Sequence, residues 1–134
     1  MICLLSSVRF RRTITGMEAP TRIDPLAAYC PAYTRAIEII GRRWTGAILR
    51  AMLSGASRFS EILGQVPGLS DRLLSERLKE LEAEGIIERR VTPTTPVRIE
   101  YVLTDKGDSL SSVIRAVAEW AGRWAQPEDA CADA

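Results

Sequence analysis

Apolar residues recur at three- and four-residue spacing in two segments before residue 55, and this pattern predicts two helices. The first begins at Pro31, because proline suits the first helical position, and it ends at Gly41. The second runs from about Arg43 to the Ser54-Gly55 pair. We expect these helices to build the core with the apolar residues Tyr33, Ile37, Ile40, Trp44, Ile48, Leu49, Met52 and Leu53.

Two shorter amphipathic segments follow, joined by a tight turn. The first covers residues 59–66 and stops at a Pro-Gly pair, and the second begins at Ser70, whose hydroxyl can cap free amide groups, and runs to Gly85. The inward face of the second carries Leu74, Leu78 and Leu81, and its outward face carries Arg72, Ser75, Glu76 and Lys79. Two short helices joined in this way are typical of a helix-turn-helix.

At Ile86 the helical period gives way to alternating β-branched residues, which predicts a β-hairpin. Its arms cover residues 87–92 and 97–103, and the prolines between them belong in the loop because they lack a donor for the ladder. The arginines on or beside the arms are Arg89, Arg90 and Arg98. A hairpin directly after a helix-turn-helix is the wing of a winged helix.

A last helix is expected to begin at Thr104-Asp105 and to end at Pro127. Its apolar stripe consists of Leu110, Val113, Ile114, Val117, Trp120, Ala121 and Trp124. An exposed stripe of this kind usually packs against a partner helix, so we expect it to form a homodimer interface.

The order of these elements predicts a mainly α fold with a small β-hairpin. We expect one winged helix-turn-helix domain over residues 25–125 with a C-terminal dimerisation helix, a flexible extension over residues 1–24 and a flexible acidic tail over residues 126–134. The apolar run near the start is too short to span a bilayer, and its arginines follow it instead of preceding it, unlike a secretory signal. No membrane partner is therefore expected.

Composition narrows the function further. The 134 residues include no histidine, which removes the usual imidazole base, the serine and cysteine triads and histidine zinc sites. The three cysteines form no C-x-x-C pair, so we expect no metal, no cofactor and no enzymatic activity, in a protein of the reducing cytoplasm. The net charge of +1 means that any argument for DNA binding depends on local arrangement.

The outward face of the second short helix offers that arrangement. Short polar and guanidinium groups near a helix N-terminus reach base edges in the major groove, so Ser70, Arg72, Ser75 and Lys79 are candidates for contact with double-stranded DNA. Arg72 suits a guanine edge and Lys79 a phosphate. Glu76 either reads cytosine or holds Arg72. Arg58 is a candidate phosphate anchor.

The hairpin would place Arg98 in the neighbouring minor groove, whereas Arg89 and Arg90 are expected to be ordinary surface residues. Mixed charges on a helix are also common on solvated surfaces. A winged-helix module that binds proteins through its last helix and its wing, without touching DNA, is therefore the alternative function.

At these residues the chain resembles the HxlR family of winged-helix regulators, which are relatives of the MarR proteins. The resemblance extends from Tyr29 to Trp124 and is carried by Cys30-Pro31, Ile40-Gly41-Arg42-Arg43-Trp44, Arg58-Phe59-Ser60-Glu61-Ile62, Pro67-Gly68-Leu69-Ser70, Arg72-Leu73-Leu74-Ser75, Leu78-Lys79-Glu80-Leu81-Glu82, Gly85-Ile86-Ile87 and residues 98–107. It implies a homodimer on a pseudo-palindromic operator, with recognition by residues 70–79 and a wing role for Arg98. The Arg42-Arg43 pair departs from the Gly-Lys pair common in the family.

The resemblance also implies that some members of the family sense an oxidant or an electrophile, a small-molecule signal, through a cysteine placed like Cys30. A position at a helix N-terminus favours the reactive thiolate. The alternative is that Cys30 is a small buried residue without reactivity. Cys131 is a candidate resolving partner, although a chance cysteine is the simpler interpretation there.

Overall fold

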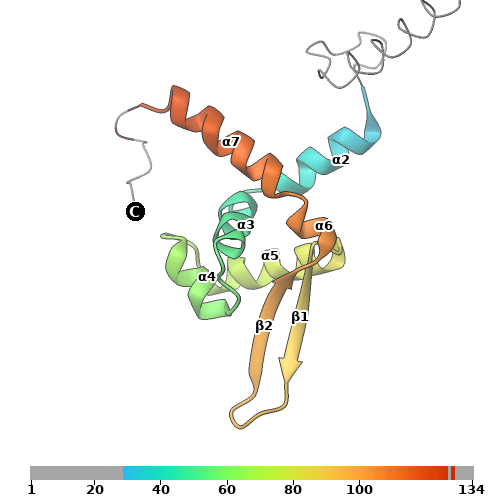
Figure 1. Ribbon diagram of the computed structural model, residues 1–134, viewed down its shortest axis with the longest axis vertical. Coiled ribbons are helices and arrows are strands. Elements are labelled where there is room, and N and C mark those ends of the chain that lie inside the picture. Colours follow the sequence, from blue (N-terminus) through green and yellow to red (C-terminus); the bar gives the residue numbers. More distant parts are fainter. Residues whose placement is uncertain (1–28, 127, 129–134) are drawn as a thin grey trace, which may run out of the picture. The chain divides into compact units, whose positions relative to one another are not determined.

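The computed structural model describes residues 29–126 and 128. In chain order its elements are α2 (Pro31–Ile40), α3 (Thr45–Leu53), α4 (Phe59–Gln65), α5 (Asp71–Ala83), β1 (Ile87–Thr92), β2 (Arg98–Leu103), α6 (Asp105–Asp108) and α7 (Ser111–Trp124), as Figure 1 shows. The chain divides into two units, residues 1–37 and 38–134. The predicted extension over residues 1–24 and Cys131 lie outside the described residues, as does the predicted tail apart from residues 126 and 128.

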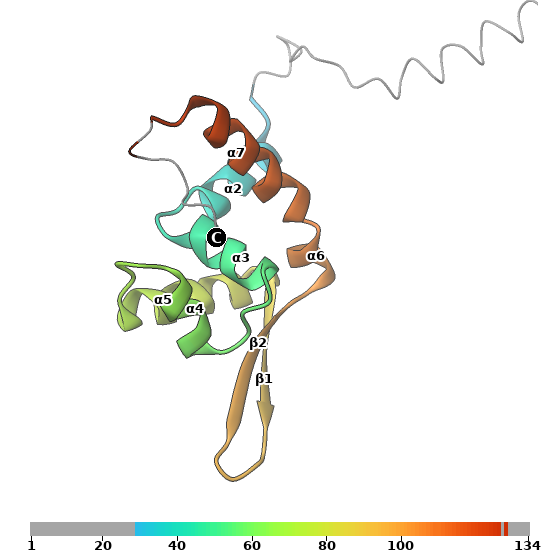
Figure 2. The same ribbon diagram turned by 60° about the vertical axis from the view of Figure 1, so that its left-hand side comes forward.

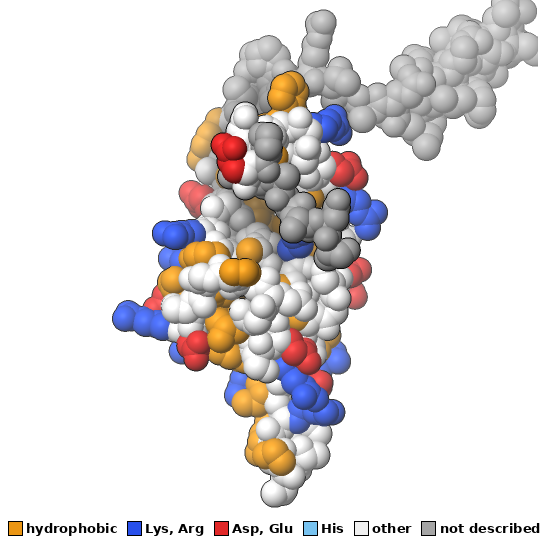
Figure 3. Space-filling model, turned by 90° about the vertical axis from the view of Figure 1, so that its left-hand side faces the viewer, with side chains coloured by type: hydrophobic (Ala, Val, Ile, Leu, Met, Phe, Trp, Pro, Cys, Tyr) orange, Lys and Arg blue, Asp and Glu red, His pale blue; other side chains and the backbone are white. Residues whose placement is uncertain are grey.

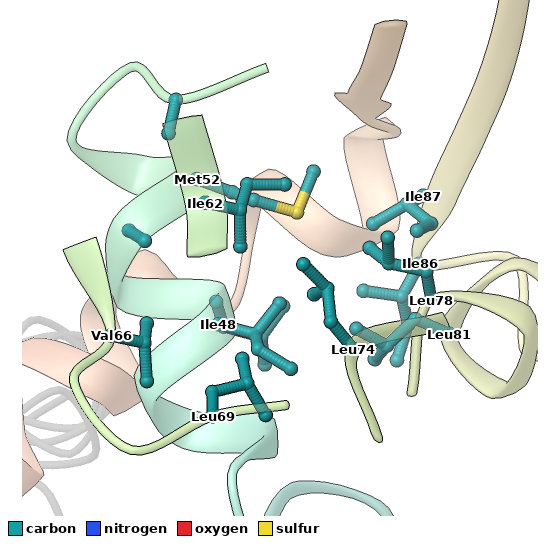
Figure 4. Packing of buried hydrophobic residues seen from close by; sticks show 13 residues of the cluster. Ile48, Met52, Ile62, Val66, Leu69, Leu74, Leu78, Leu81, Ile86 and Ile87 are labelled. Atoms are coloured by element: carbon teal, nitrogen blue, oxygen red, sulfur yellow. The ribbon is translucent and has the colours of Figure 1, made fainter. Parts of the chain in front are cut away.

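The core lies in the second unit and is built by α3, α4, α5 and the start of the hairpin. Figure 4 shows Ile48 of α3, Leu69 of the turn before α5, and Leu74 of α5 directed toward a common interior. The fully buried large side chains are Ile48, Leu49, Ile62, Leu74, Leu78, Leu81 and Ile87. Burial of these residues is the main favourable contribution to folding, and it fixes which side of α5 faces inward.

The first two helices differ from the expectation. α2 has no buried residue, and Tyr33 and Ile37 are exposed, so the prediction that they build the core is wrong. These two residues belong to the first unit, whereas Ile39 and Ile40 belong to the second and pack against the core.

Trp44 is not a helical residue, contrary to the expected start near Arg43. Its φ of 74° lies in the left-handed region, so the chain turns there and α3 begins at Thr45.

The helix-turn-helix has the predicted pattern, with α4 and α5 joined by the turn at Pro67-Gly68. Gly68 has φ 85°, a conformation that glycine adopts without steric cost. At the start of α5, the Ser70 hydroxyl accepts a hydrogen bond from the Leu73 N–H at 3.2 Å. The expected cap is therefore confirmed. α5 ends at Ala83, two residues before the predicted glycine.

The hairpin pairs β1 with β2 in antiparallel register, from Ile87 opposite Leu103 to Thr92 opposite Arg98. Figures 1 and 2 show it extending away from the helices of the second unit, as a wing does. At its base the Tyr101 N–H donates to the Ser57 carbonyl oxygen at 2.7 Å. The loop before α4 thus holds the base of the wing.

The predicted last helix is two helices, α6 and α7, because the chain first makes a compact turn against the α5–β1 corner. The Thr104 hydroxyl donates to the Gly85 carbonyl oxygen at 2.6 Å and accepts from the Gly107 N–H at 3.2 Å. The Lys106 ammonium donates to the Glu84 carbonyl oxygen at 2.6 Å. A side chain at Gly107 would overlap the Ile86 carbonyl oxygen, so this close approach requires glycine.

Candidate nucleic-acid interface

The outward face of α5 presents the residues that the sequence predicted. Arg72 has a side chain that is 89% exposed, and Lys79 lies exposed farther along the helix. Ser70 is exposed at the N-terminus, whereas Ser75 is half-buried. The leucines on the other side of α5 are in the core, so this face is available to a partner.

Arg72 and Glu76 form an ion pair on this face. The Arg72 Nε donates to Glu76 Oε1 at 3.2 Å across one helical turn. Of the two roles considered for Glu76, contact with cytosine and retention of Arg72, the second is the one present in the structure without DNA. A base or phosphate that binds Arg72 must compete with this carboxylate.

Arg58 and Arg98, which are 40 positions apart in the sequence, line one groove between α4 and the wing. The groove has a volume of about 730 Å³ and is lined by Arg58, Phe59, Ser60, Thr92, Thr94, Thr95, Pro96, Val97, Arg98 and Ile99. Two guanidinium groups on one groove between α4 and the wing suit a phosphate backbone. The structure thus brings together two candidates that the sequence analysis assigned to separate contacts.

The N-terminus of α4, which carries Arg58, is fixed by Glu61. One carboxylate oxygen of Glu61 accepts the N–H groups of Ser57 and Arg58, each at 3.0 Å. These backbone hydrogen bonds stabilise the ionised carboxylate and lower the pKa of Glu61 below its ordinary value of 4.5, although the side chain is exposed. The sequence analysis assigned no role to Glu61. Its place three residues after Arg58 is the signal that a capping carboxylate would give.

The remaining wing arginines have the character expected of surface residues. Arg90 contacts Glu88 on its own strand, with its Nε 3.3 Å from Glu88 Oε1. Arg89 is exposed. On the face drawn in Figure 3, Lys and Arg side chains gather near the hairpin with Asp and Glu side chains among them. The positive potential is therefore local, in agreement with the net charge of +1.

Arg77 is a residue of α5 that the sequence analysis missed. Only 8% of it is exposed, and its Nε donates to the Arg43 carbonyl oxygen at 3.0 Å. Its Nη1 donates to both carboxylate oxygens of Glu80, at 3.2 and 3.1 Å. The sequence does carry a signal for this burial, because Arg77 follows Leu74 by three residues and so lies on the inward side of the helical pattern.

Cys30 directly precedes α2, and its carbonyl oxygen accepts the Thr34 N–H at 2.9 Å. The cysteine is exposed and forms no disulfide. In this single chain Cys30 is therefore not the buried packing residue of the alternative.

The apolar stripe of the last helix divides into two parts. Leu110 and Ile114 are half-buried and pack against the core of the same chain. The exposed part, which we call the α7 apolar surface, consists of Val113, Val117, Trp120, Ala121 and Trp124. A shallow groove of about 500 Å³ lies on it, lined by Ser112, Val113, Ala116, Val117 and Trp120.

Residues 29–126 and 128 contain neither a metal-binding cluster nor a membrane-spanning helix. No group of three or more cysteine and acidic residues is placed to hold a metal ion in this part of the chain. No helix in these ranges has both the length and the apolar character needed to cross a bilayer.

Residues 39–129 match the family described as the HxlR-like helix-turn-helix. The uncharacterized HTH-type transcriptional regulator YvaP of Bacillus subtilis is 50% identical over 98 residues, which are 73% of this chain and 91% of YvaP. The HTH-type transcriptional regulator YodB of the same bacterium is 42% identical over 100 residues, 75% of this chain and 89% of YodB.

Solved structures agree with this similarity. The reduced form of YodB matches with a TM-score of 0.65 at 41% identity, covering 74% of this chain and 97% of the YodB chain. The oxidized form of the redox regulator HypR matches with a TM-score of 0.66 at 33% identity, covering 72% and 99%. YodB has also been solved after diamide treatment and with bound quinone. The expected winged-helix fold is confirmed, and the relatives are transcriptional regulators and not enzymes.

Proposed function

The chain belongs to the HxlR-like helix-turn-helix family and is a DNA-binding transcriptional regulator; on that premise we propose that it binds a pseudo-palindromic operator as a homodimer, with α5 in the major groove. The observation that carries the proposal is the combination of an exposed polar face on α5 with a groove between α4 and the wing that is lined by two arginines. Such a protein acts where the chromosome lies, in the cytoplasm.

Each candidate residue has a role that follows from its chemistry. Arg72 donates to a guanine edge after it leaves Glu76, and Lys79 contacts a phosphate farther along the groove. Ser70 and Ser75 offer hydroxyls near the helix N-terminus. Arg58 neutralises a phosphate at the start of α4, and Arg98 enters the adjacent minor groove from the wing.

The α7 apolar surface supports the homodimer. Trp120 is 64% exposed and Trp124 is 71% exposed, and a monomer gains nothing from two indole rings in water. Pairing of this surface with that of a second copy would bury the rings and present two α5 helices. Half-sites would then lie roughly 34–36 Å apart, one turn of B-form DNA.

Binding to DNA duplexes at several salt concentrations tests this function. Arg72→Ala should weaken binding by about 1–3 kcal/mol and relax the preference at one base pair, because a bidentate contact is lost. Lys79→Ala should weaken all sequences evenly and reduce the salt slope by about 1. If both variants bind the preferred duplex like the parent, the assignment of α5 as the reading helix is wrong.

The same titration separates DNA binding from the alternative of a protein-interaction module. Phosphate contacts give a steep fall of affinity with salt, whereas a module that binds only proteins shows weak binding with no sequence preference. An absence of any preferred duplex would favour the alternative.

We also propose that Cys30 makes the regulator responsive to oxidants or electrophiles. The support is its exposure at the start of α2, together with the similarity to YodB, solved in reduced, diamide-treated and quinone-bound forms, and to HypR. Diamide or a quinone should release or reposition the parent on its operator, and Cys30→Ser should not respond. An equal response of parent and variant would place any sensing elsewhere.

A further inference from the structure

A buried guanidinium group lies on the inward side of the recognition helix. Arg77 is almost out of water, and a charge in that position requires charged or polar partners. It has two, the Arg43 carbonyl oxygen at 3.0 Å and the Glu80 carboxylate at 3.1 Å. Nothing in the DNA-contacting roles described above uses Arg77.

The Arg43 carbonyl oxygen lies in the segment between α2 and α3, residues 41–44, which we call the junction, whereas Glu80 lies on α5 itself. Arg42 of the junction lies with its Nη2 3.3 Å from Glu80 Oε1, so Glu80 contacts both Arg42 and Arg77. Trp44 of the junction touches the helix-turn-helix turn, since a methyl group at Gly68 would lie 3.3 Å from its Cη2. The junction thus contacts α5 at its middle and the turn that precedes it.

We propose that Arg77 is a positioning residue for DNA recognition, which holds α5 in one orientation against the junction. This inference rests on the proposed role of α5. Two contacts cross from α5 to the junction: the Arg77 Nε donates to the Arg43 carbonyl oxygen, and Glu80, which Arg77 holds on the same helix, pairs with Arg42. The planar guanidinium donates in fixed directions, so these contacts specify how the helix lies against the junction. Readout of bases depends on such support, because donors displaced by about 0.5 Å lose productive geometry.

The leucine core alone does not supply this constraint. Apolar burial is non-directional, so Leu74 and Leu78 hold α5 in the core but constrain its angle less than directed hydrogen bonds do. A buried polar network with a single satisfied geometry does fix it. The expected consequence of removing Arg77 is therefore loss of sequence discrimination, and not loss of attraction to DNA.

The test compares two duplexes, one that the parent protein enriches from a random-sequence pool and one with the same bases shuffled. Arg77→Met keeps most of the side-chain volume and removes the donors. We expect the ratio of the two affinities to fall about tenfold, while the salt slope on the shuffled duplex stays unchanged. Arg77→Lys keeps the positive charge but lacks the planar guanidinium with its fixed donors, so it should give an intermediate ratio of affinities.

Arg115→Met is the matched control, because Arg115 is an exposed arginine of α7. It should leave the ratio of the two affinities unchanged.

An unchanged ratio in Arg77→Met overturns the inference. A parallel loss of affinity for both duplexes also overturns it, because a smaller folded fraction would produce the same loss. If Arg77→Met does not fold, Glu80→Gln carries the test, with a fall of the ratio required. A parent that enriches no sequence overturns this inference and the proposed function together, whereas a preserved ratio beside a selective parent overturns this inference alone.

Discussion

Arg72 Nε lies 3.2 Å from Glu76 Oε1, so the arginine expected to read DNA is held by a carboxylate of its own helix. The pair is exposed and separated by four positions, an arrangement that contributes a few tenths of a kcal/mol to a helix, about 0.3–0.5. DNA can therefore displace Glu76 from Arg72 at a small cost in free energy. We therefore expect Glu76 to weaken non-specific binding to DNA, because its charge repels phosphate.

Glu76→Gln should increase affinity for non-specific DNA. The change frees Arg72 and removes one negative charge from the interface, so we expect affinity at low salt to rise about three- to tenfold and the salt slope to steepen by about 1. Fluorescence anisotropy with a shuffled duplex measures both. Glu82→Gln, a change at an exposed glutamate elsewhere on α5, controls for net charge. Equal effects of the two variants would show that the Arg72 pair is irrelevant.

Ser70→Ala should destabilise the domain by about 1 kcal/mol, because the Leu73 N–H loses the hydroxyl that accepts its hydrogen bond. Urea denaturation followed by circular dichroism gives the free energy of unfolding. Ser60→Ala, in the first turn of α4, makes the same chemical change without removing an N-cap. A loss in Ser60→Ala as large as that in Ser70→Ala would argue against the cap.

Glu61→Gln should change how stability depends on pH. The pKa of Glu61 is lowered in the folded state, so its ionised form contributes stability above its ordinary pKa of 4.5, and this contribution is lost as pH falls through the lowered pKa. The parent should therefore be more stable than Glu61→Gln near pH 7. The difference between their unfolding free energies should shrink below about pH 4.5. Urea denaturation across that range measures it, and a pH-independent difference would contradict the assignment.

Gly107→Ala should destabilise the domain by about 2–3 kcal/mol, because its Cβ would meet the Ile86 carbonyl oxygen and lie 3.0 Å from Leu103 Cδ2. Thermal denaturation measures the loss. Gly64→Ala is the control, since Gly64 lies within α4 with nothing within 4 Å of a Cβ, and alanine there should stabilise by about 0.5–1 kcal/mol. Tolerance of Gly107→Ala would mean that the corner is looser than the structure indicates.

Val117→Glu should yield a folded monomer. Val117 lies in the middle of the α7 apolar surface and is 56% exposed, so a glutamate there is harmless to one chain but unpaired in a dimer interface. Sedimentation equilibrium should show half the parent mass, and operator affinity should fall about a hundredfold through loss of bivalency. Arg115→Glu places the same residue on the opposite side of α7 and should remain dimeric. A parent that is itself monomeric would refute the dimer.

Much of the fold follows from periodicity. The spacing of Leu74, Leu78 and Leu81 gave the inward face of α5 correctly, and the Ser70 cap and the hairpin arms lie within a residue or two of their predicted positions. These features are local, since each depends on residues a few positions apart. Sequence patterns report such features well.

The parts that could not be predicted depend on contacts distant in sequence. Trp44 fits a helical pattern, yet it adopts a left-handed conformation beside Gly68, 24 positions away. Thr104 and Lys106, at the start of α6, donate hydrogen bonds to the Gly85 and Glu84 carbonyl oxygens just after α5, 19 and 22 positions away. The Arg77 network joins positions separated by 34 residues. Periodicity carries no information about such partners.

The interruption between Asp108 and Ser111 has a consequence for how relatives of this chain diversify. The start of α6 is hydrogen-bonded to the segment that follows α5, whereas α7 carries the surface that would meet a second copy. Substitutions in the two intervening residues, Ser109 and Leu110, would therefore alter the distance between half-sites while the base preference stays intact. With α5 as the recognition helix and α7 as the dimer contact, changes in α5 would do the reverse, so we expect operator length and operator sequence to vary independently.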